Sequence, residues 1–258
     1  GQESLAQNLD RLFFAKNARM SGEFEELFNA LFPKADKYIA VIKVLAGHRE
    51  GMIRADIISA TAIEGGELSK ILENLRRCDF IEVYSRYKSS VRNALYRICD
   101  PYVLFYFKFI SGNHSKDERF WSNNIGSRQV SAWQGFSFET VCMQHLPQIK
   151  LKLGIAGIAT TSCSWRKIGS STEQGAQIDL LIDRADRVIN VCEMKFSETP
   201  YSITKEYEEK LRTKMAVFRR EMKATKTLLL TMVTTFGVMQ GLHSGIVHNE
   251  VVMDDLFL

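Results

Sequence analysis

The sequence has few cysteines, and they follow no pattern typical of a metal site or a disulfide framework. Its five cysteines are scattered, no C-x-x-C pair occurs, and no closely spaced histidines complete a zinc site. We therefore expect buried, reduced thiols, the usual state of cysteine in the cytoplasm. The sequence thus predicts a cytoplasmic protein without structural zinc.

Long apolar runs are also missing, and we expect no cleavable signal peptide. The longest apolar runs, YVLFYF at 102–107 and TLLLTMV at 227–233, are shorter than the ~20 residues that a membrane-spanning helix needs. We therefore expect no membrane partner. Hydrophobic residues at 45% and charged residues at 25% exclude a disordered or fibrous chain. A formal net charge of +4 permits a polyanionic partner without requiring one.

The 258 residues suffice for two modest domains, and the first half has a helical rhythm. Two predicted helices are followed, after a turn, by a third in ELSKILENLRRC at 67–78, whose apolar stripe is Leu68, Ile71, Leu72 and Leu75. The next stretch, at 80–100, reads as two strands around a polar basic tip. This order resembles a winged helix-turn-helix, whose third helix is the usual recognition element.

The third helix and the hairpin tip contain the candidate DNA contacts. These are Lys70, Asn74 and Arg77 on the helix, with Arg86, Lys88 and Arg92 at the tip. Glu67 and Glu73 make the exposed face of the helix nearly neutral, whereas a groove-reading helix normally concentrates positive charge. Both DNA contact and protein docking therefore stay open. The tip favours DNA, because long cationic side chains reach phosphates without reading bases.

The second half alternates helices and strands. A helix is expected over 131–146 and a β-rich stretch over 151–165. Two strands follow, QIDLLID at 177–183 and VINVCEMKF at 188–196, both apolar in the middle as interior strands are. A long amphipathic helix at 202–224 and a buried strand at 226–237 complete the pattern. The order of helix, three strands, helix and strand predicts an α/β layer fold.

Charged residues at the ends of these two strands indicate a catalytic site. Glu193 and Lys195 are two apart and project from one side of their strand. Asp179 occupies a matching place if the strands pair as a hairpin around 184–186. Adjacent carboxylates repel, so we expect a neutralising cation, and Mg²⁺ or Mn²⁺ suits oxygen ligands. Lys195 would then orient a water or stabilise phosphate charge.

At these residues the sequence resembles the PD-(D/E)XK nuclease superfamily, in which an Asp and a Glu-x-Lys occupy adjacent central strands. Asp179 matches the first motif position, and Glu193 with Lys195 match the second; Ile178 stands where the motif has Pro. Glu139 matches an acidic residue of the preceding helix. The resemblance implies that the four residues are catalytic and that the three carboxylates hold the metal. A structural charge network, or a degenerate nuclease fold that only binds, is the alternative.

Longer motifs resemble the carboxy-terminal half of bacterial and archaeal P-loop ATPases whose tail is the domain of unknown function numbered 234. They are ICDPYVLFYFKF at 98–109, GFSFE at 135–139, QIDLLIDR at 177–184, CEMKF at 192–196 and ITKEY at 203–207. No G-x-x-x-x-G-K-[ST] occurs, so ATP would bind only in a preceding ATPase domain. The expected parts are a helical lead-in at 1–35, a winged helix at 36–110, a linker at 111–128 and an αβββαβ nuclease-like domain at 129–258.

Two functions remain open from the sequence. One is a DNA-processing enzyme that hydrolyses phosphodiester bonds with Mg²⁺, with Lys205 as a further candidate phosphate contact. The other is a non-catalytic module that binds DNA or protein and regulates an attached ATPase. The expected partners are DNA and the protein's own ATPase domain.

Overall fold

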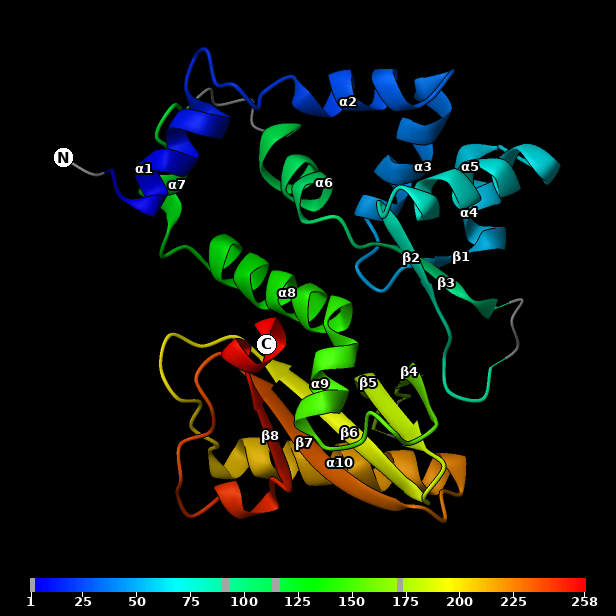
Figure 1. Cartoon of the computed structure of the whole chain (residues 1–258), viewed down its shortest axis with the longest axis vertical. Helices are drawn as coiled ribbons and strands as arrows, with labels where there is room; N and C mark the ends of the chain where they lie inside the picture. The colour runs from blue at the N-terminus through cyan, green and yellow to red at the C-terminus, as the bar shows by residue number, and fades with distance from the viewer. Residues whose placement is uncertain (1–2, 90–92, 113–116, 171–173) are drawn as a thin grey trace. The chain divides into compact units, whose positions relative to one another are not determined.

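The computed structural model describes residues 3–89, 93–112, 117–170 and 174–258, which belong to two compact units (Figure 1). The first unit consists of Gly1–Tyr84 and Ser90–Trp133, and the second of Ser85–Ser89 and Gln134–Leu258. Each contains helices and a β-sheet, so the predicted mixed α+β composition is confirmed. Within the described ranges, no helix combines the length and the apolar character needed to cross a membrane.

Part of the first unit is a helical cluster with an aromatic core. Its helices are α1 (Leu5–Leu9) with the π-helical η1 (Asp10–Phe14), α2 (Glu23–Leu31), α6 (Pro101–Phe105) with the π-helical η3 (Tyr106–Ile110), and α7 (Phe120–Asn124). The side chain of Asp100 caps α6, and Pro101 occupies its first turn, where no intrahelical N–H is needed. Phe105, Phe109 and Trp121 pack together in this core.

The other part of the first unit is three helices and a small sheet. The chain runs through α3 (Ala35–Ala46), β1 (Met52–Ile53), α4 (Arg54–Thr61), α5 (Gly65–Arg77), β2 (Ile81–Tyr84) and β3 (Leu95–Ile98). The strands are antiparallel in the order β1-β3-β2. The predicted apolar stripe of α5 is buried throughout. Gly51, at φ +80°, approaches β3 so closely that a Cβ would lie 2.7 Å from the carbonyl oxygen of Tyr96.

The second unit is a mixed five-stranded sheet with helices. Its elements are the end of α8 (Arg128–Gln144), α9 (Leu146–Lys152), β4 (Thr160–Lys167), β5 (Ala176–Arg184), β6 (Val188–Lys195), α10 (Lys205–Met222), β7 (Thr227–Thr234), the 3-10 turn η4 (Ser244–Ile246), β8 (Asn249–Val252) and the 3-10 turn η5 (Met253–Phe257). The strand order is β4-β5-β6-β7-β8. Strands β4, β5 and β6 pair antiparallel, whereas β6, β7 and β8 pair parallel.

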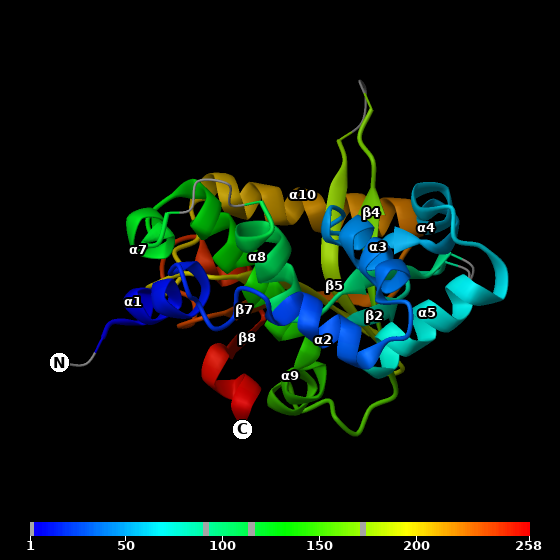
Figure 2. The same ribbon diagram turned by 90° about the horizontal axis from the view of Figure 1, so that it is seen from above.

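Helices cover both faces of this sheet, as Figures 1 and 2 show. Phe138 of α8 and Ile149 of α9 pack on one face, together with Leu180 and Cys192. Phe218 of α10 packs on the other face, beside Leu181 and other apolar strand residues. Strands β5 and β6 are therefore buried on both sides, as their apolar centres predicted.

The boundaries differ from the expected ones in four places. The units divide at Trp133/Gln134, inside α8, and the stretch expected to be a linker at 111–128 contains α7, whose Trp121 is buried in the first unit. Of the β-rich stretch at 151–165, only the part from Thr160 is strand, because the preceding residues continue α9 and a turn. The connection Ser85–Ser89 belongs to the second unit, since it bonds to β4.

Candidate active site

Glu193 is the centre of a buried cluster of charged and polar side chains in the second unit. It lies on β6 and is only 5% exposed. Its Oε1 accepts hydrogen bonds from the hydroxyl of Tyr207 at 2.8 Å and from Nζ of Lys195 at 3.0 Å. Its Oε2 accepts from Nζ of Lys214. Tyr207 and Lys214 lie two turns apart on α10, so this helix covers the carboxylate.

The electrostatics of the cluster favour an ionised Glu193. Burial opposes the charged form, but Lys214 and Lys195 outweigh it and hold the pKa of Glu193 below its ordinary value. Burial likewise disfavours the charged Lys195, yet the neighbouring Glu193 raises the pKa of that ammonium. Burial, followed by the charge of Glu193, raises the pKa of Tyr207. At neutral pH the cluster therefore contains a carboxylate, an ammonium on Lys195 and a neutral phenol.

Asp179 lies next to this cluster along the paired strands. The antiparallel pairing predicted for β5 and β6 is confirmed, and it ends with Leu180 opposite Cys192. Asp179 directly precedes Leu180, and Glu193 directly follows Cys192. On the other side of β5 the register shifts, so that Asp179 and Leu180 lie opposite the single residue Ser164. Such bulges often redirect side chains beside active sites.

Asp179 is half-buried and accepts a hydrogen bond at its Oδ1 from Nε2 of Gln177 at 2.8 Å. This acceptor role leaves the carboxylate capable of further bonds, because an ionised carboxylate accepts at both oxygens. Asp179 is thus the more accessible of the two strand carboxylates.

Glu139 is on α8, in the part of the helix that belongs to the second unit. Its charge is among those that raise the pKa of Lys195, so Glu139 lies within electrostatic reach of the cluster. Its neighbour Phe138 is buried against the sheet, which fixes this turn of α8 there. All four residues predicted from the sequence therefore belong to one unit.

Two carboxylates of the candidate site are of the ligand type that a divalent ion prefers. Asp179 and Glu193 offer carboxylate oxygens from neighbouring strands, which suits Mg²⁺, an ion that binds few carboxylates and keeps several waters. Among the described residues, however, no three His, Cys, Asp or Glu side chains form a group ready to hold a metal. The oxygens of Glu193 already accept from two ammonium groups. The expected three-carboxylate ligand set stays a prediction.

Sequence reasoning did not place Lys214 or Tyr207 beside Glu193. A signal was present, because the apolar stripe of α10 includes the buried Leu211 and Phe218. Lys214 follows Leu211 by three residues and precedes Phe218 by four, so it lies on the buried face of the helix. A lysine in an apolar stripe predicts a buried anionic partner, although it does not say which one.

The candidate DNA contacts of α5 differ in their surroundings. Asn74 donates a hydrogen bond to the hydroxyl of Tyr38 at 2.8 Å, so its amide is engaged within the first unit. Arg77 donates to Glu73 at 2.9 Å on the exposed side of the helix. Lys70 is exposed. Of these three residues, Lys70 and Arg77 therefore offer cationic groups at the surface.

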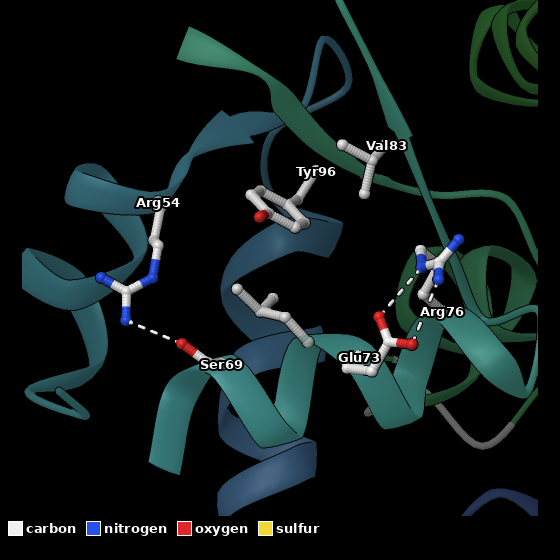
Figure 3. Close-up of a pocket in the computed structure, with 7 residues that line it drawn as sticks. Arg54, Ser69, Glu73, Arg76, Val83 and Tyr96 are labelled. Atoms are coloured by element: carbon white, nitrogen blue, oxygen red, sulfur yellow. Dashed lines mark hydrogen bonds and ion pairs between the residues drawn. The ribbon is translucent and has the colours of Figure 1, made fainter. Parts of the chain in front are cut away.

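A cleft of about 170 Å³ lies between α5 and the small sheet (Figure 3). Arg54 donates to the hydroxyl of Ser69 at one side, and Glu73 binds Arg76 at the other. The ring of Tyr96 lies between these two pairs. The cleft is thus bounded by charged groups that already have partners.

The segment Ser85–Ser89 of the second unit is bonded to the edge strand β4. The backbone N–H of Tyr87 donates to the carbonyl oxygen of Ser164 at 2.7 Å, and the Tyr87 ring packs against Phe218. Burial, then the nearby Asp183, raises the pKa of Tyr87 to about 12. Of the predicted tip contacts, Arg86 is half-buried and Lys88 is exposed.

The two remaining candidate contacts lie elsewhere. Arg92 falls outside the described residues, so its predicted role has no structural counterpart here. Lys205 is exposed in the first turn of α10, one residue after the capping Thr204. The candidate DNA contacts therefore belong to both units.

Comparisons with known proteins give no relative from which to transfer a function: no family model matches the chain, and neither the curated proteins nor the solved structures contain a significant match.

Proposed function

We propose that the chain is a DNA-processing module with a metal-dependent phosphodiesterase site formed by Asp179, Glu193 and Lys195, assisted by Glu139. The observation that carries this proposal is the contact of Lys195 with Glu193 beside the point where β5 and β6 separate, next to Asp179. Carboxylates and a lysine on neighbouring central strands are the residue types needed to hold a cation and stabilise phosphate charge.

The topology of the second unit supports a nuclease-like fold. A helix, three antiparallel strands, a helix and a strand parallel to the third agree with the order expected of PD-(D/E)XK proteins, with α9 added after the first helix and β8 added at the edge. A bound Mg²⁺ would supply charge neutralisation at the scissile phosphate. Asp179 and Glu193 would hold it, and Lys195 would orient water or meet the phosphate.

The topology of the first unit supports a winged helix-turn-helix. Helix α3, strand β1, helices α4 and α5, and the hairpin β2–β3 follow one another, with β3 between β1 and β2. In this proposal α5 is the recognition helix, and Lys70 and Arg77 are its phosphate contacts. The whole chain would then be the DNA-facing part of a P-loop ATPase.

A non-catalytic regulatory module of such an ATPase is the second candidate, and one observation favours it. Glu193 already has two ammonium partners and a phenol, so its charge is compensated without a metal. Such a compensated cluster is compatible with a fold that only binds DNA or protein.

An assay of metal-dependent DNA cleavage distinguishes the nuclease from the non-catalytic binding module. The protein is incubated with linear, branched and single-stranded DNA in Mg²⁺ or Mn²⁺, alongside Lys195→Ala and Asp179→Ala. We expect Lys195→Ala to lose cleavage while it keeps metal binding, because lysine is not a ligand. Asp179→Ala should lose both, and Glu139→Ala should fall between them, since a helix carboxylate reaches the metal directly or through water.

The control is Lys210→Ala, an exposed lysine on α10 that leaves the site unchanged. Intact DNA with every substrate and both metals, or equal cleavage by wild type and Lys195→Ala, would reject the nuclease and leave the binding module.

A further inference from the structure

A second pocket of the first unit, with a volume of about 250 Å³, lies between the start of α3 and α5. Three lysines line it, Lys34 and Lys37 at the start of α3 and Lys70 on α5. Its acidic residue is Glu67, which pairs with Lys37. Among the described lining residues, three positive charges and one negative charge leave a net charge of +2. The pocket therefore favours an anion.

Two of these lysines have ammonium groups available to a ligand. Lys34 and Lys70 are exposed, and neither makes a hydrogen bond or ion pair with another side chain in the described part of the chain. The hydrogen bond from Lys37, and then the charges of Lys37 and Lys34, hold the pKa of Glu67 below its ordinary value, so Lys34 lies within electrostatic reach of this pair. Lys70 follows Glu67 by three residues and lies on the same face of α5. The arginines of the cleft in Figure 3, by contrast, already bind side chains of that cleft.

Tyr38 offers a hydroxyl proton to the same pocket. It lines the pocket and is 6% exposed, and its ring stacks on that of Phe32 with 4.1 Å between the centroids. The hydroxyl oxygen accepts from Nδ2 of Asn74 at 2.8 Å, and no described residue accepts the hydroxyl proton. Buried hydroxyl groups normally use their donor as well. Tyr38 is therefore a fixed donor for a ligand oxygen.

A phosphate monoester matches these groups in charge and in hydrogen bonding. At neutral pH it carries about −1.5 to −2 charges and three acceptor oxygens, whereas each phosphate within a DNA strand carries a single charge. Helix α3 begins at the pocket without a side-chain cap, and a helix N-terminus favours anions. The pocket is smaller than the roughly 300–1,000 Å³ of sites that enclose a drug-sized ligand, so it suits the phosphate group and not a whole nucleotide.

We propose that this pocket binds a phosphate monoester, and that the monoester is the terminal phosphate of a DNA strand. Lys70 and Asn74 belong to α5, the recognition helix of the proposed function, so a DNA end is the source of phosphate that this helix would meet. The inference rests on the proposed function and narrows its substrate to DNA with phosphorylated ends.

Fluorescence anisotropy with matched duplexes tests the pocket. The duplexes share one sequence and an internal label, end in 5′-phosphates, in 3′-phosphates or only in hydroxyl groups, and are titrated without divalent metal so that they stay intact. We expect wild type to bind a phosphorylated duplex about tenfold more tightly than the hydroxyl-ended one, the ratio given by one hydrogen bond of typical strength to a charged group.

Three variants assign this preference to the pocket. Lys34→Gln removes an available ammonium and should bring the ratio of the two affinities toward one. Tyr38→Phe removes only the hydroxyl group and should lower the ratio while the affinity for the hydroxyl-ended duplex stays unchanged. Lys43→Gln is the matched control, an exposed lysine of α3 that does not line the pocket, and it should keep the ratio of wild type. A preference that survives in both Lys34→Gln and Tyr38→Phe overturns the assignment.

Calorimetric titration with adenosine monophosphate distinguishes a DNA end from a free phosphate compound. If this compound binds wild type but not Lys34→Gln, and all duplexes bind equally well, the pocket is confirmed and the DNA end is overturned as its source. Equal duplex affinities without binding of adenosine monophosphate overturn the pocket and leave the DNA-binding function intact. Absence of duplex binding overturns the DNA end together with the proposed DNA function. Thermal unfolding verifies that each variant is folded, and the exposed Lys34→Gln still tests the pocket if Tyr38→Phe unfolds.

Discussion

Glu73 and Glu193 each bind two cationic side chains, but in opposite surroundings. On α5, Glu73 pairs with Arg76 and Arg77, and its side chain is 41% exposed. On β6, Glu193 pairs with Lys195 and Lys214, and its side chain is 6% exposed. The exposed group competes with water and salt, so its arginines remain free to turn toward a phosphate. The buried group has lost its water, so each of its members depends on the others.

The largest expected difference between the two groups is in stability. Glu193→Gln leaves Lys195 and Lys214 without their counter-charge in a buried position, and we expect a loss of about 3–5 kcal/mol in the free energy of unfolding. Glu73→Gln removes only solvent-screened pairs and should change stability little. Urea unfolding followed by circular dichroism measures both. Equal losses in the two variants would contradict the comparison.

Acidification should weaken the contribution of the buried group. Because the folded-state pKa of Glu193 lies below its ordinary value of 4.5, its ionised form contributes stability above that pH. This contribution is lost as the pH falls through the folded-state pKa. The stability gap between wild type and Glu193→Gln should therefore narrow from pH 7 toward pH 3, as measured by urea unfolding at each pH. A gap that stays constant would show that Glu193 does not titrate as expected.

A smaller effect on stability is expected for Tyr207, the neutral side chain that binds Glu193. Tyr207→Phe removes one hydrogen bond to Glu193 and should cost about 1 kcal/mol in the free energy of unfolding. Because burial and Glu193 raise the folded-state pKa of Tyr207, its contribution is present below its ordinary pKa of 10 and is lost as the pH rises through the folded-state pKa. Thermal unfolding between pH 7 and pH 11 should show a weaker alkaline loss in Tyr207→Phe than in wild type. An identical alkaline loss would rule out this role.

The smallest effects are expected in DNA affinity, for Lys70 and Arg77 on the exposed side of α5. If Lys70 and Arg77 contact phosphates, each alanine substitution should lower the slope of log affinity against log salt by about one, without changing sequence preference. Fluorescence anisotropy with a duplex at several salt concentrations measures the slope. Glu67→Gln is the control, because it removes an acidic residue of α5 and no cation. Slopes unchanged in both alanine variants would indicate protein docking by this helix.

Much of the fold could be predicted because local periodicity decides it. The stripe Leu68, Ile71, Leu72 and Leu75 predicted the buried face of α5, and the apolar centres of β5 and β6 predicted interior strands. The stretch at 111–128 was harder, because its polar composition hides Trp121, which is buried only when the helices of the first unit pack around it.

The candidate site could likewise be predicted only in part from the sequence. The alternation of side chains along a strand placed Glu193 and Lys195 on one side, and their contact at 3.0 Å follows from that spacing. The bulge at Asp179 and Leu180 has no local signature, because it depends on how β5 pairs with β4 and β6 at once.

The sequence by itself indicated the buried stripe of α5, the interior strands β5 and β6 and the Glu-x-Lys pair of β6, because these depend on residues close together along the chain. Tertiary structure alone decided that Tyr207 and Lys214 bind Glu193, and that the connection Ser85–Ser89 bonds to β4. These contacts join residues far apart in the sequence. They form where packing removes water from a buried carboxylate or from a strand edge, and each such group must then find a partner elsewhere in the fold.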